Sequence, residues 1–149
     1  MIDFKIIKSF KDFDENLQTQ MLIEFLYLHL DRFRDSREAI TACLEYAMSD
    51  MAAKGGFVVL ALENNEIAGA VVMINTGMKY YIPEYFLVYI AVHAQKRNKG
   101  LGRKLLEKVI SMVEGDIALH VEYDNPAKRL YEKVGFKSKY AEMRYNREE

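Results

Sequence analysis

The sequence has little cysteine, no long apolar run and no leader-like beginning. Cys43 is the only cysteine among 149 residues, so an internal disulfide cannot form, which fits a reducing compartment. No stretch approaches the roughly 18 uninterrupted apolar residues that a membrane-spanning helix requires. The first residues lack both the basic region and the apolar run of a signal peptide. We therefore expect a cytoplasmic protein.

The chain also has almost no net charge. It carries 21 Lys and Arg residues against 22 Asp and Glu residues, for a formal net charge of −1. Bulk electrostatics therefore give no reason to expect nucleic acid or a membrane surface as a partner. Half of the residues are hydrophobic and 29% are charged, which is an ordinary balance for a globular domain. At this length we predict one domain spanning residues 1–149.

Hydrophobic periodicity predicts a mixture of strands and helices. Strands are expected at 2–8, 57–62, 67–75, 85–92, 117–122, 136–139 and 140–145. Helices are expected at 13–33, 36–53, 101–113 and 126–134. The second and third strands are joined by a short Asn-containing turn, which is typical of an antiparallel hairpin. The helix at 101–113 should link two parallel strands in a right-handed crossover.

The most informative stretch runs from the strand at 85–92 into the helix at 101–113. Between them lies a polar, basic turn that ends at Gly100, with Gly102 shortly after it. This order places free backbone N–H groups and the positive end of a helix dipole at one point, which favours a phosphate group. A side chain at either glycine would hold such a ligand away from the amides. The basic residues of this region indicate a small polyanion, and they are Lys96, Arg97, Lys99, Arg103 and Lys104.

Two common phosphate-binding fingerprints do not fit this turn. The dinucleotide motif needs a third glycine three residues after the second, where this chain has Leu105. The nucleoside-triphosphate loop needs Gly-Lys-Ser/Thr, whereas Gly102 is followed by Arg103 and Lys104. A nucleotide-binding or nucleic-acid module is therefore disfavoured.

Two segments together resemble the GNAT N-acetyltransferases. The turn is similar to the family's acetyl-CoA motif, Gln/Arg-x-x-Gly-x-Gly/Ala, through Arg97, Gly100 and Gly102. The second family motif is Asn-x-x-Ala-x-x-Leu-Tyr-x-x-x-Gly-Phe, and the residues that match it are Asn125, Leu130, Tyr131, Gly135 and Phe136. The chain departs from that motif at one position, since Lys128 stands where the alanine is usual and Ala127 precedes it. The order of elements along nearly the whole chain is also similar to that fold.

The resemblance implies an α/β (α+β), GNAT-like fold with three layers. We expect a mixed central sheet of about six to seven strands, splayed between strands 4 and 5 and flanked by about four helices. In the family, the pantetheine arm of CoA occupies this splay and pairs with the central strand like an added strand. Here Ile90 and Val92 would make those contacts, which would also give their backbone groups partners.

The resemblance further implies acetyl-CoA as cosubstrate and no metal. The backbone amides of residues 97–102 would hold the diphosphate, assisted by the helix dipole and the neighbouring positive charge. Asn125 would hydrogen-bond the pantetheine arm, although capping its own helix is an equally good role for it. The expected cofactor-binding residues are Ile90, Ala91, Val92, Arg97, Asn98, Lys99, Gly100, Leu101, Gly102, Arg103, Asn125 and Tyr131.

The same resemblance assigns catalytic roles. Tyr131 would be the general acid, because a phenol with a reference pKa of about 10 is protonated at neutral pH and can quench a CoA thiolate. An alkylammonium must lose a proton before it can attack, so a base is expected. Glu84, at the head of the central strand, is the leading candidate, and His120, Glu122 or a water chain are the alternatives.

These features predict an N-acetyltransferase that moves the acetyl group of acetyl-CoA directly to an amine. The acceptor, a small molecule or a peptide or protein, is left open, as are an acyl group longer than acetyl and a homodimer. The alternative is a non-catalytic, sensory CoA- or acyl-CoA-binding domain on the same fold. Retention of Tyr131 favours the enzyme over that alternative. We expect no nucleic-acid or membrane partner.

Overall fold

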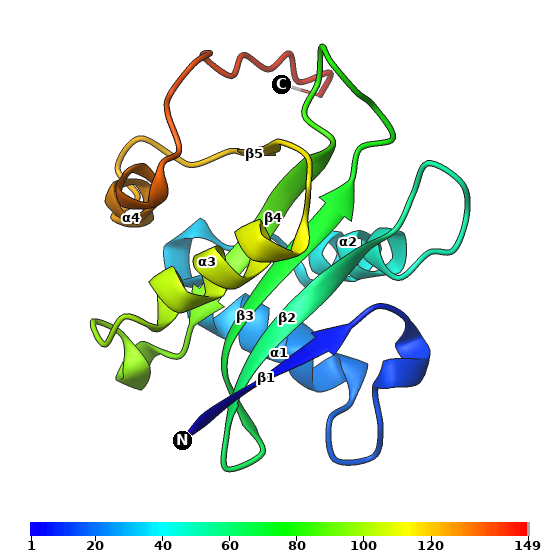
Figure 1. Cartoon of the computed structure of the whole chain (residues 1–149), viewed down its shortest axis with the longest axis vertical. Coiled ribbons are helices and arrows are strands. Elements are labelled where there is room, and N and C mark those ends of the chain that lie inside the picture. Colours follow the sequence, from blue (N-terminus) through cyan, green and yellow to red (C-terminus); the bar gives the residue numbers. More distant parts are fainter. Residues whose placement is uncertain (149) are drawn as a thin grey trace.

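A five-stranded mixed sheet forms the centre of the protein in the computed structural model, which describes residues 1–148 (Figure 1). The strands follow chain order across the sheet: β1 (Ile2–Ile7), β2 (Gly56–Glu63), β3 (Glu66–Asn75), β4 (Tyr85–Val92) and β5 (Ile117–Leu119). Neighbours are antiparallel except β4 and β5, which are parallel. The helices are α1 (Thr19–His29), α2 (Arg37–Ala47), α3 (Leu101–Met112) and α4 (Ala127–Val134). Short 3-10 turns lie at Phe10–Asp12, Asp31–Phe33 and Ala94–Lys96.

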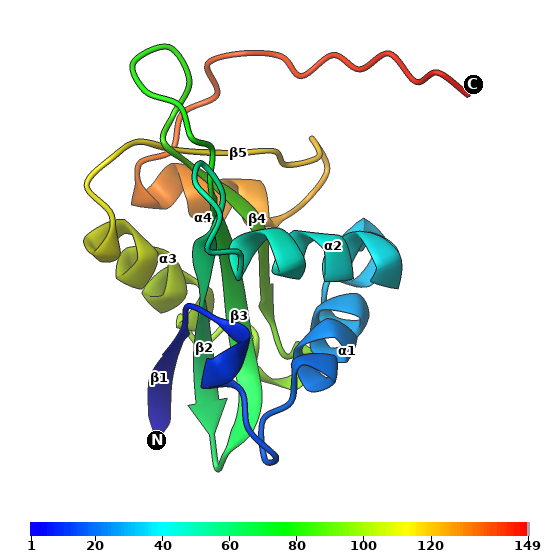
Figure 2. The same ribbon diagram turned by 90° about the vertical axis from the view of Figure 1, so that its right-hand side faces the viewer.

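Helices cover both faces of the sheet, as Figure 2 shows. The central strands are rich in β-branched and other apolar residues because both of their faces are buried. On one face α1 and α2 pack through Leu22, Leu26, Ile40 and Leu44. On the other face α3 and α4 pack through a separate set of their own residues that includes Leu105, Leu106, Val109 and Tyr131. The expected three-layer α/β architecture is confirmed.

The sheet opens between β4 and β5. Only Tyr85, Phe86 and Leu87 pair with β5, through Ile117, Ala118 and Leu119. Residues 88–92 of β4 continue with β3 on one side and with no strand on the other within residues 1–148. The predicted splay between strands 4 and 5 is therefore present.

Two predicted helices are shorter in the structure. The helix expected at 13–33 is confined to α1, because Asp14 Oδ1 accepts the N–H groups of Asn16 and Leu17 at 2.9 and 2.8 Å and forms a turn there. It ends before Asp31, whose φ of 58° is left-handed. The helix expected at 36–53 ends at Ala47, since the Tyr46 carbonyl turns to the N–H groups of residues 49 and 55, both 3.1 Å away.

The last two predicted strands, 136–139 and 140–145, are wrong. In the described chain these residues form no ladder, and Tyr140, Met143 and Tyr145 are 85%, 91% and 81% exposed. A strand this exposed buries too little apolar surface to offset the entropy of ordering it. The strand at 117–122 is likewise reduced to β5. The sheet accordingly has five strands rather than six or seven. Among residues 1–148, no helix has the length and apolar character needed to cross a membrane.

Candidate active site

The turn between β4 and α3 leaves a run of backbone donors unused. Asn98 and Gly100 both adopt left-handed conformations, with φ of 65° and 83°. Together with the start of α3, this geometry leaves the N–H groups of residues 97–103 without an acceptor in the described chain. Consecutive N–H groups at a helix N-terminus form a site for an anion. The amides expected to bind phosphate are thus free to do so.

The two glycines of this turn have different structural roles. A Cβ at Gly100 would meet no atom within 4 Å, so it would project into open space beside the free amides. A Cβ at Gly102 would lie 3.0 Å from Leu130 Cδ2 on α4. Gly102 therefore allows α3 and α4 to approach closely, whereas Gly100 permits the left-handed turn and keeps its surface open.

The basic side chains of the turn are divided between structure and solvent. Lys96 forms an ion pair with Glu63 on β2. Arg97 turns inward, with Nε 3.1 Å from the Val92 carbonyl and a terminal nitrogen 2.6 Å from the His29 carbonyl. Within residues 1–148, Lys99 and Lys104 are exposed and form no ion pair. Arg97 thus braces the turn, and the two lysines carry its available charge.

The open edge of β4 presents alternate backbone groups. The His93 N–H donates to the Ala68 carbonyl at 2.8 Å, so Ala91 also directs its polar groups toward β3. By the same alternation, Ile90 and Val92 direct theirs toward the gap beside β5. Ala91 was predicted with them as a cofactor residue, but the structure places only its two neighbours at the open edge.

Asn125 stands at the start of α4 and caps it. Its Oδ1 accepts the N–H of Ala127 at 2.9 Å. Its Nδ2 group has no acceptor among the residues described. Both roles foreseen for Asn125 are compatible with this geometry, since capping uses the oxygen and leaves the nitrogen.

Tyr131 lies on the face of α4 that packs against α3 and the sheet. It is 7% exposed, and its ring contacts Phe136 with centroids 5.9 Å apart. Burial raises the pKa of Tyr131 to about 12. The hydroxyl hydrogen-bonds to no group within residues 1–148. No fully buried side-chain oxygen or nitrogen lacks a partner among these residues, so the Tyr131 oxygen reaches the surface, where solvent or a ligand can bind it.

The candidate bases occupy less enclosed positions. Glu84 precedes β4 at the end where β5 is still paired, and its Oε2 accepts the Asp116 N–H at 3.2 Å. His120 is exposed and meets the Phe86 ring edge-on, with centroids 4.8 Å apart. Glu122 is exposed on the loop that follows β5. The structure places none of the three in contact with Tyr131 within the part of the chain described.

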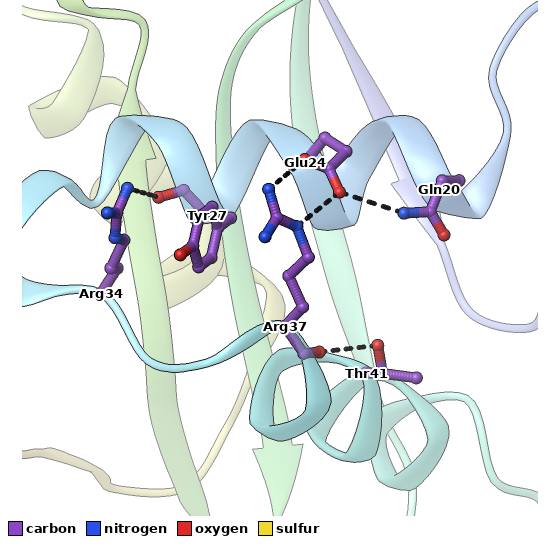
Figure 3. A network of polar contacts seen from close by, with 6 residues as sticks. All are labelled: Gln20, Glu24, Tyr27, Arg34, Arg37 and Thr41. Carbon is purple, nitrogen blue, oxygen red and sulfur yellow. Dashed lines mark hydrogen bonds and ion pairs between the residues drawn. The ribbon is translucent and has the colours of Figure 1, made fainter.

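Several polar contacts of the α1–α2 side were not foreseen from the sequence. The Tyr89 hydroxyl on β4 donates to Asp35 Oδ2 at 2.6 Å. A terminal nitrogen of Arg32, in the turn after α1, lies 3.0 Å from a carboxylate oxygen of Asp124, in the loop between β5 and α4. A network of Gln20, Glu24, Tyr27, Arg34, Arg37 and Thr41 ties α1 to α2 (Figure 3). Tyr89 and Asp35 are 54 positions apart and Arg32 and Asp124 are 92 apart, so no local pattern marks these two pairs.

Cys43 and possible metal ligands add no further chemistry. Burial, followed by the charge of Asp35, raises the pKa of Cys43 to about 12, so the thiol is protonated at neutral pH. A protonated thiol is a poor nucleophile, so Cys43 is expected to be inert. Among residues 1–148, no group of three or more His, Cys, Asp or Glu side chains is arranged to hold a metal ion.

Comparison with known proteins places this geometry in a family. The profile described as Acetyltransferase (GNAT) domain matches residues 54–138, which run from just before β2 to just past α4. The chain belongs to the GNAT acetyltransferase family. The matched segment includes the open edge of β4, the turn, α3 and Tyr131. It does not include α1 or α2, so the GNAT match rests on the part of the molecule that carries the free amides.

Individual relatives agree with the GNAT assignment. N-alpha-acetyltransferase 30 of Xenopus laevis is 37% identical over 82 residues, which are 52% of this chain but only 30% of that protein. The structure of the NatC complex bound to Gag peptide and CoA has a similar fold, with a TM-score of 0.71, 21% identity and coverage of 93% of this chain and 86% of that one. A ribosomal-protein-alanine N-acetyltransferase from Brucella melitensis biovar Abortus 2308 gives a TM-score of 0.65 at 16% identity, over 98% and 99% of the two chains.

Proposed function

We propose that this protein transfers the acetyl group of acetyl-CoA to an amine. The observation that supports this most directly is the set of N–H groups of residues 97–103, which are unpaired within the described chain and follow directly on the open edge of β4. A diphosphate joined to an extended, amide-containing arm would satisfy both sets of backbone groups at once. CoA has this chemistry, and its binding agrees with membership of the GNAT family.

Each part of the proposed ligand has candidate contacts. The diphosphate would accept from the amides of residues 97–103, with Lys99 and Lys104 supplying positive charge. Ile90 and Val92 would pair with the pantetheine arm, and Asn125 Nδ2 would donate to it. Arg97 contributes its amide, while its guanidinium holds the turn through the Val92 and His29 carbonyls.

The reaction then needs one proton delivered and one removed. The amine nitrogen bonds to the acetyl carbon, the carbon–sulfur bond breaks, and the electron pair leaves on sulfur. Tyr131 is proposed to protonate that sulfur. Its raised pKa keeps the phenol protonated, and the burial that raises it would also raise the pKa of a thiol formed beside it. The pKa values of the Tyr131 phenol and of the CoA thiol would therefore rise together.

A base for the acceptor ammonium is the less defined part of the proposal. Glu84 remains our candidate as a carboxylate just before β4, at the end of the strand that pairs with β5. To act, it would release the Asp116 N–H or work through a water molecule, with His120 and Glu122 as alternatives. The acceptor would enter on the α1–α2 side or past the loop that carries Glu84.

Replacement of the Tyr131 hydroxyl tests the proposal. Purified protein is incubated with acetyl-CoA and a panel of amines and peptides, and free thiol is measured. Tyr131→Phe should lower turnover by at least about 100-fold, the usual range for a lost general acid, while CoA affinity changes less than about twofold. Tyr123→Phe, at an 85% exposed tyrosine just before α4, is the matched control.

The outcomes separate the acid role from the activity itself. Thiol release that Tyr131→Phe leaves unchanged would refute the acid role. If no amine in the panel releases thiol from acetyl-CoA although CoA binds, the transferase proposal fails and only a CoA-binding domain remains.

A further inference from the structure

Two histidines lie beneath the turn that is proposed to bind the CoA diphosphate. His29 is the last residue of α1 and is 9% exposed, and His93 follows β4 directly. Their rings are tilted by 35° with centroids 4.3 Å apart, and the Phe25 ring also contacts His29, with centroids 4.6 Å apart. This pair is the point where α1, from one face of the sheet, touches the turn that leads to the other face.

Each imidazole accepts a backbone N–H of the turn. His29 Nδ1 accepts from Ala94 at 3.1 Å, and His93 Nδ1 accepts from Gln95 at 3.1 Å. An imidazolium carries a proton on both nitrogens and cannot accept either bond. The observed geometry therefore requires both rings to be unprotonated at Nδ1, so both are neutral. The peptide units that they hold lie immediately before the free amides of residues 97–103.

The surrounding groups oppose a positive charge on His29. Burial, followed by the neighbouring His93 and Arg97, lowers the pKa of His29. The Arg97 guanidinium donates to the His29 carbonyl at 2.6 Å and so brings a positive charge close to the ring. Lys96 is paired with Glu63. On α1, the preceding aromatic Phe25 offers no charge to compensate an imidazolium.

We propose that neutral His29, in contact with His93, positions the β4–α3 turn for CoA, so that protonation of His29 releases the turn and weakens cofactor binding. The inference rests on the proposed CoA site and adds that pH regulates the affinity of this site for CoA. His29 is a positioning residue, because it acts through the peptide unit of Ala94 rather than on the ligand. The expected sign follows from this: affinity for CoA falls as the pH falls.

A direct role in anion binding would give the opposite sign. An imidazolium that faced the diphosphate would attract it, and CoA affinity would rise on acidification. The direction of the pH effect therefore distinguishes a support beneath the turn from a ligand for the phosphates. If CoA binding expels one proton from His29, the affinity for CoA falls by up to about tenfold for each pH unit below the pKa of His29 in the free protein.

Calorimetric titration of CoA at pH 7.5 and pH 5.5 tests the proposal with a matched set of variants. His29→Asn keeps an acceptor close to the position of Nδ1 but cannot be protonated. His29→Phe keeps the ring and loses the acceptor. Glu45→Gln, at an exposed position of α2, is the control. Because CoA phosphates also titrate, the informative quantity is the ratio of affinities at the two pH values, compared between variants.

We expect the wild type and Glu45→Gln to share the same loss of affinity at pH 5.5, and His29→Asn to show a loss at least about threefold smaller. At pH 7.5, His29→Asn should bind nearly as the wild type does, and His29→Phe about fivefold or more weakly, since the Ala94 N–H is left unpaired. Equal pH ratios in the wild type and His29→Asn would overturn the proposal, as would tighter wild-type binding at low pH.

A measurement on the unmodified protein protects the test against variants that fail to fold. In an NMR titration without ligand, the Ala94 amide signal should shift with the same apparent pKa as the His29 ring signals. An Ala94 amide signal that does not change as the His29 ring titrates would also overturn the proposal. If no CoA binding is found at pH 7.5 in the wild type, the proposed function fails instead, so the two failures are distinct.

Discussion

The two sides of the sheet differ in how completely their polar groups are used. On the α1–α2 side, Arg37 makes two hydrogen bonds to Glu24, at 2.8 and 3.1 Å, and the guanidinium groups of Arg34 and Arg37 lie 4.1 and 3.8 Å from the Tyr27 ring (Figure 3). Tyr89 is likewise bound to Asp35. Polar side chains on this face are paired with one another and tie α1 to α2 and the loop between them to β4.

On the α3–α4 side, strong hydrogen-bonding groups are left without partners within residues 1–148. These are the amides of residues 97–103, the outward backbone groups of Ile90 and Val92, and the Tyr131 hydroxyl. Unpaired groups of this kind are costly unless solvent or a ligand satisfies them. The polar groups without a protein partner therefore gather on the side that carries the proposed CoA site.

The largest expected effect comes from blocking the free amides. Gly100→Val places a branched side chain beside them and forces a residue with φ of 83° out of its preferred region. We expect CoA affinity to fall by about 100-fold or more, equivalent to about 2.7 kcal/mol, as measured by calorimetry.

Gly135→Val is the matched control for this change. Gly135 also has a positive φ, 115°, and a Cβ there would meet nothing within 4 Å, but it lies at the far end of α4. Both variants should lose about 1–2 kcal/mol of stability from backbone strain. Only Gly100→Val should lose CoA binding, and similar losses of affinity in both would show that strain, and not the amide site, controls it.

A smaller effect is expected on the paired side. Tyr89→Phe removes the hydroxyl that donates to Asp35 at 2.6 Å, in a setting where burial and that bond raise the pKa of the phenol. We expect a loss of about 1–2 kcal/mol in the free energy of unfolding, measured with denaturant, because a hydrogen bond to a charged group is lost. CoA affinity should be unchanged. A large loss of affinity with full stability would contradict the division between the two sides.

Much of the unpaired side could be predicted from the sequence because its signals are local. An aromatic and β-branched run, a glycine with a left-handed conformation and an amphipathic helix follow one another within residues 85–112. The resulting strand, turn and helix therefore have the predicted boundaries within a residue or so. The splay also followed from the family resemblance carried by Gly100, Gly102 and Tyr131.

The contacts of the paired side could not be predicted, because they join residues distant in sequence. His29 and Ala94 are 65 positions apart, and Tyr89 and Asp35 are 54 positions apart. Their geometry depends on how α1 and α2 dock, which no local pattern specifies. The error at residues 136–145 has the converse cause: alternation there is typical of strands, but in the described chain no neighbouring strand pairs with it. Alternation of apolar and polar residues is necessary for a half-buried strand, but it does not show that a neighbouring strand is available to pair with it.

The smallest expected effect is the pH dependence of the α1–α2 network. Hydrogen bonds from Arg37 hold the pKa of Glu24 below its usual value. The stabilisation is therefore present above the unfolded pKa of Glu24 and is lost as the pH falls through the lower, folded pKa. Because the Glu24–Arg37 pair is exposed, Glu24→Gln should reduce stability at pH 7 by less than Tyr89→Phe does. High salt should shrink the effect of Glu24→Gln further, since it screens the charges. Thermal unfolding at pH 7 and pH 3 measures this, with Glu45→Gln as a control on an exposed face of α2. A destabilisation by Glu24→Gln that persists at pH 3 would show that the side chain acts through packing and not through its charge.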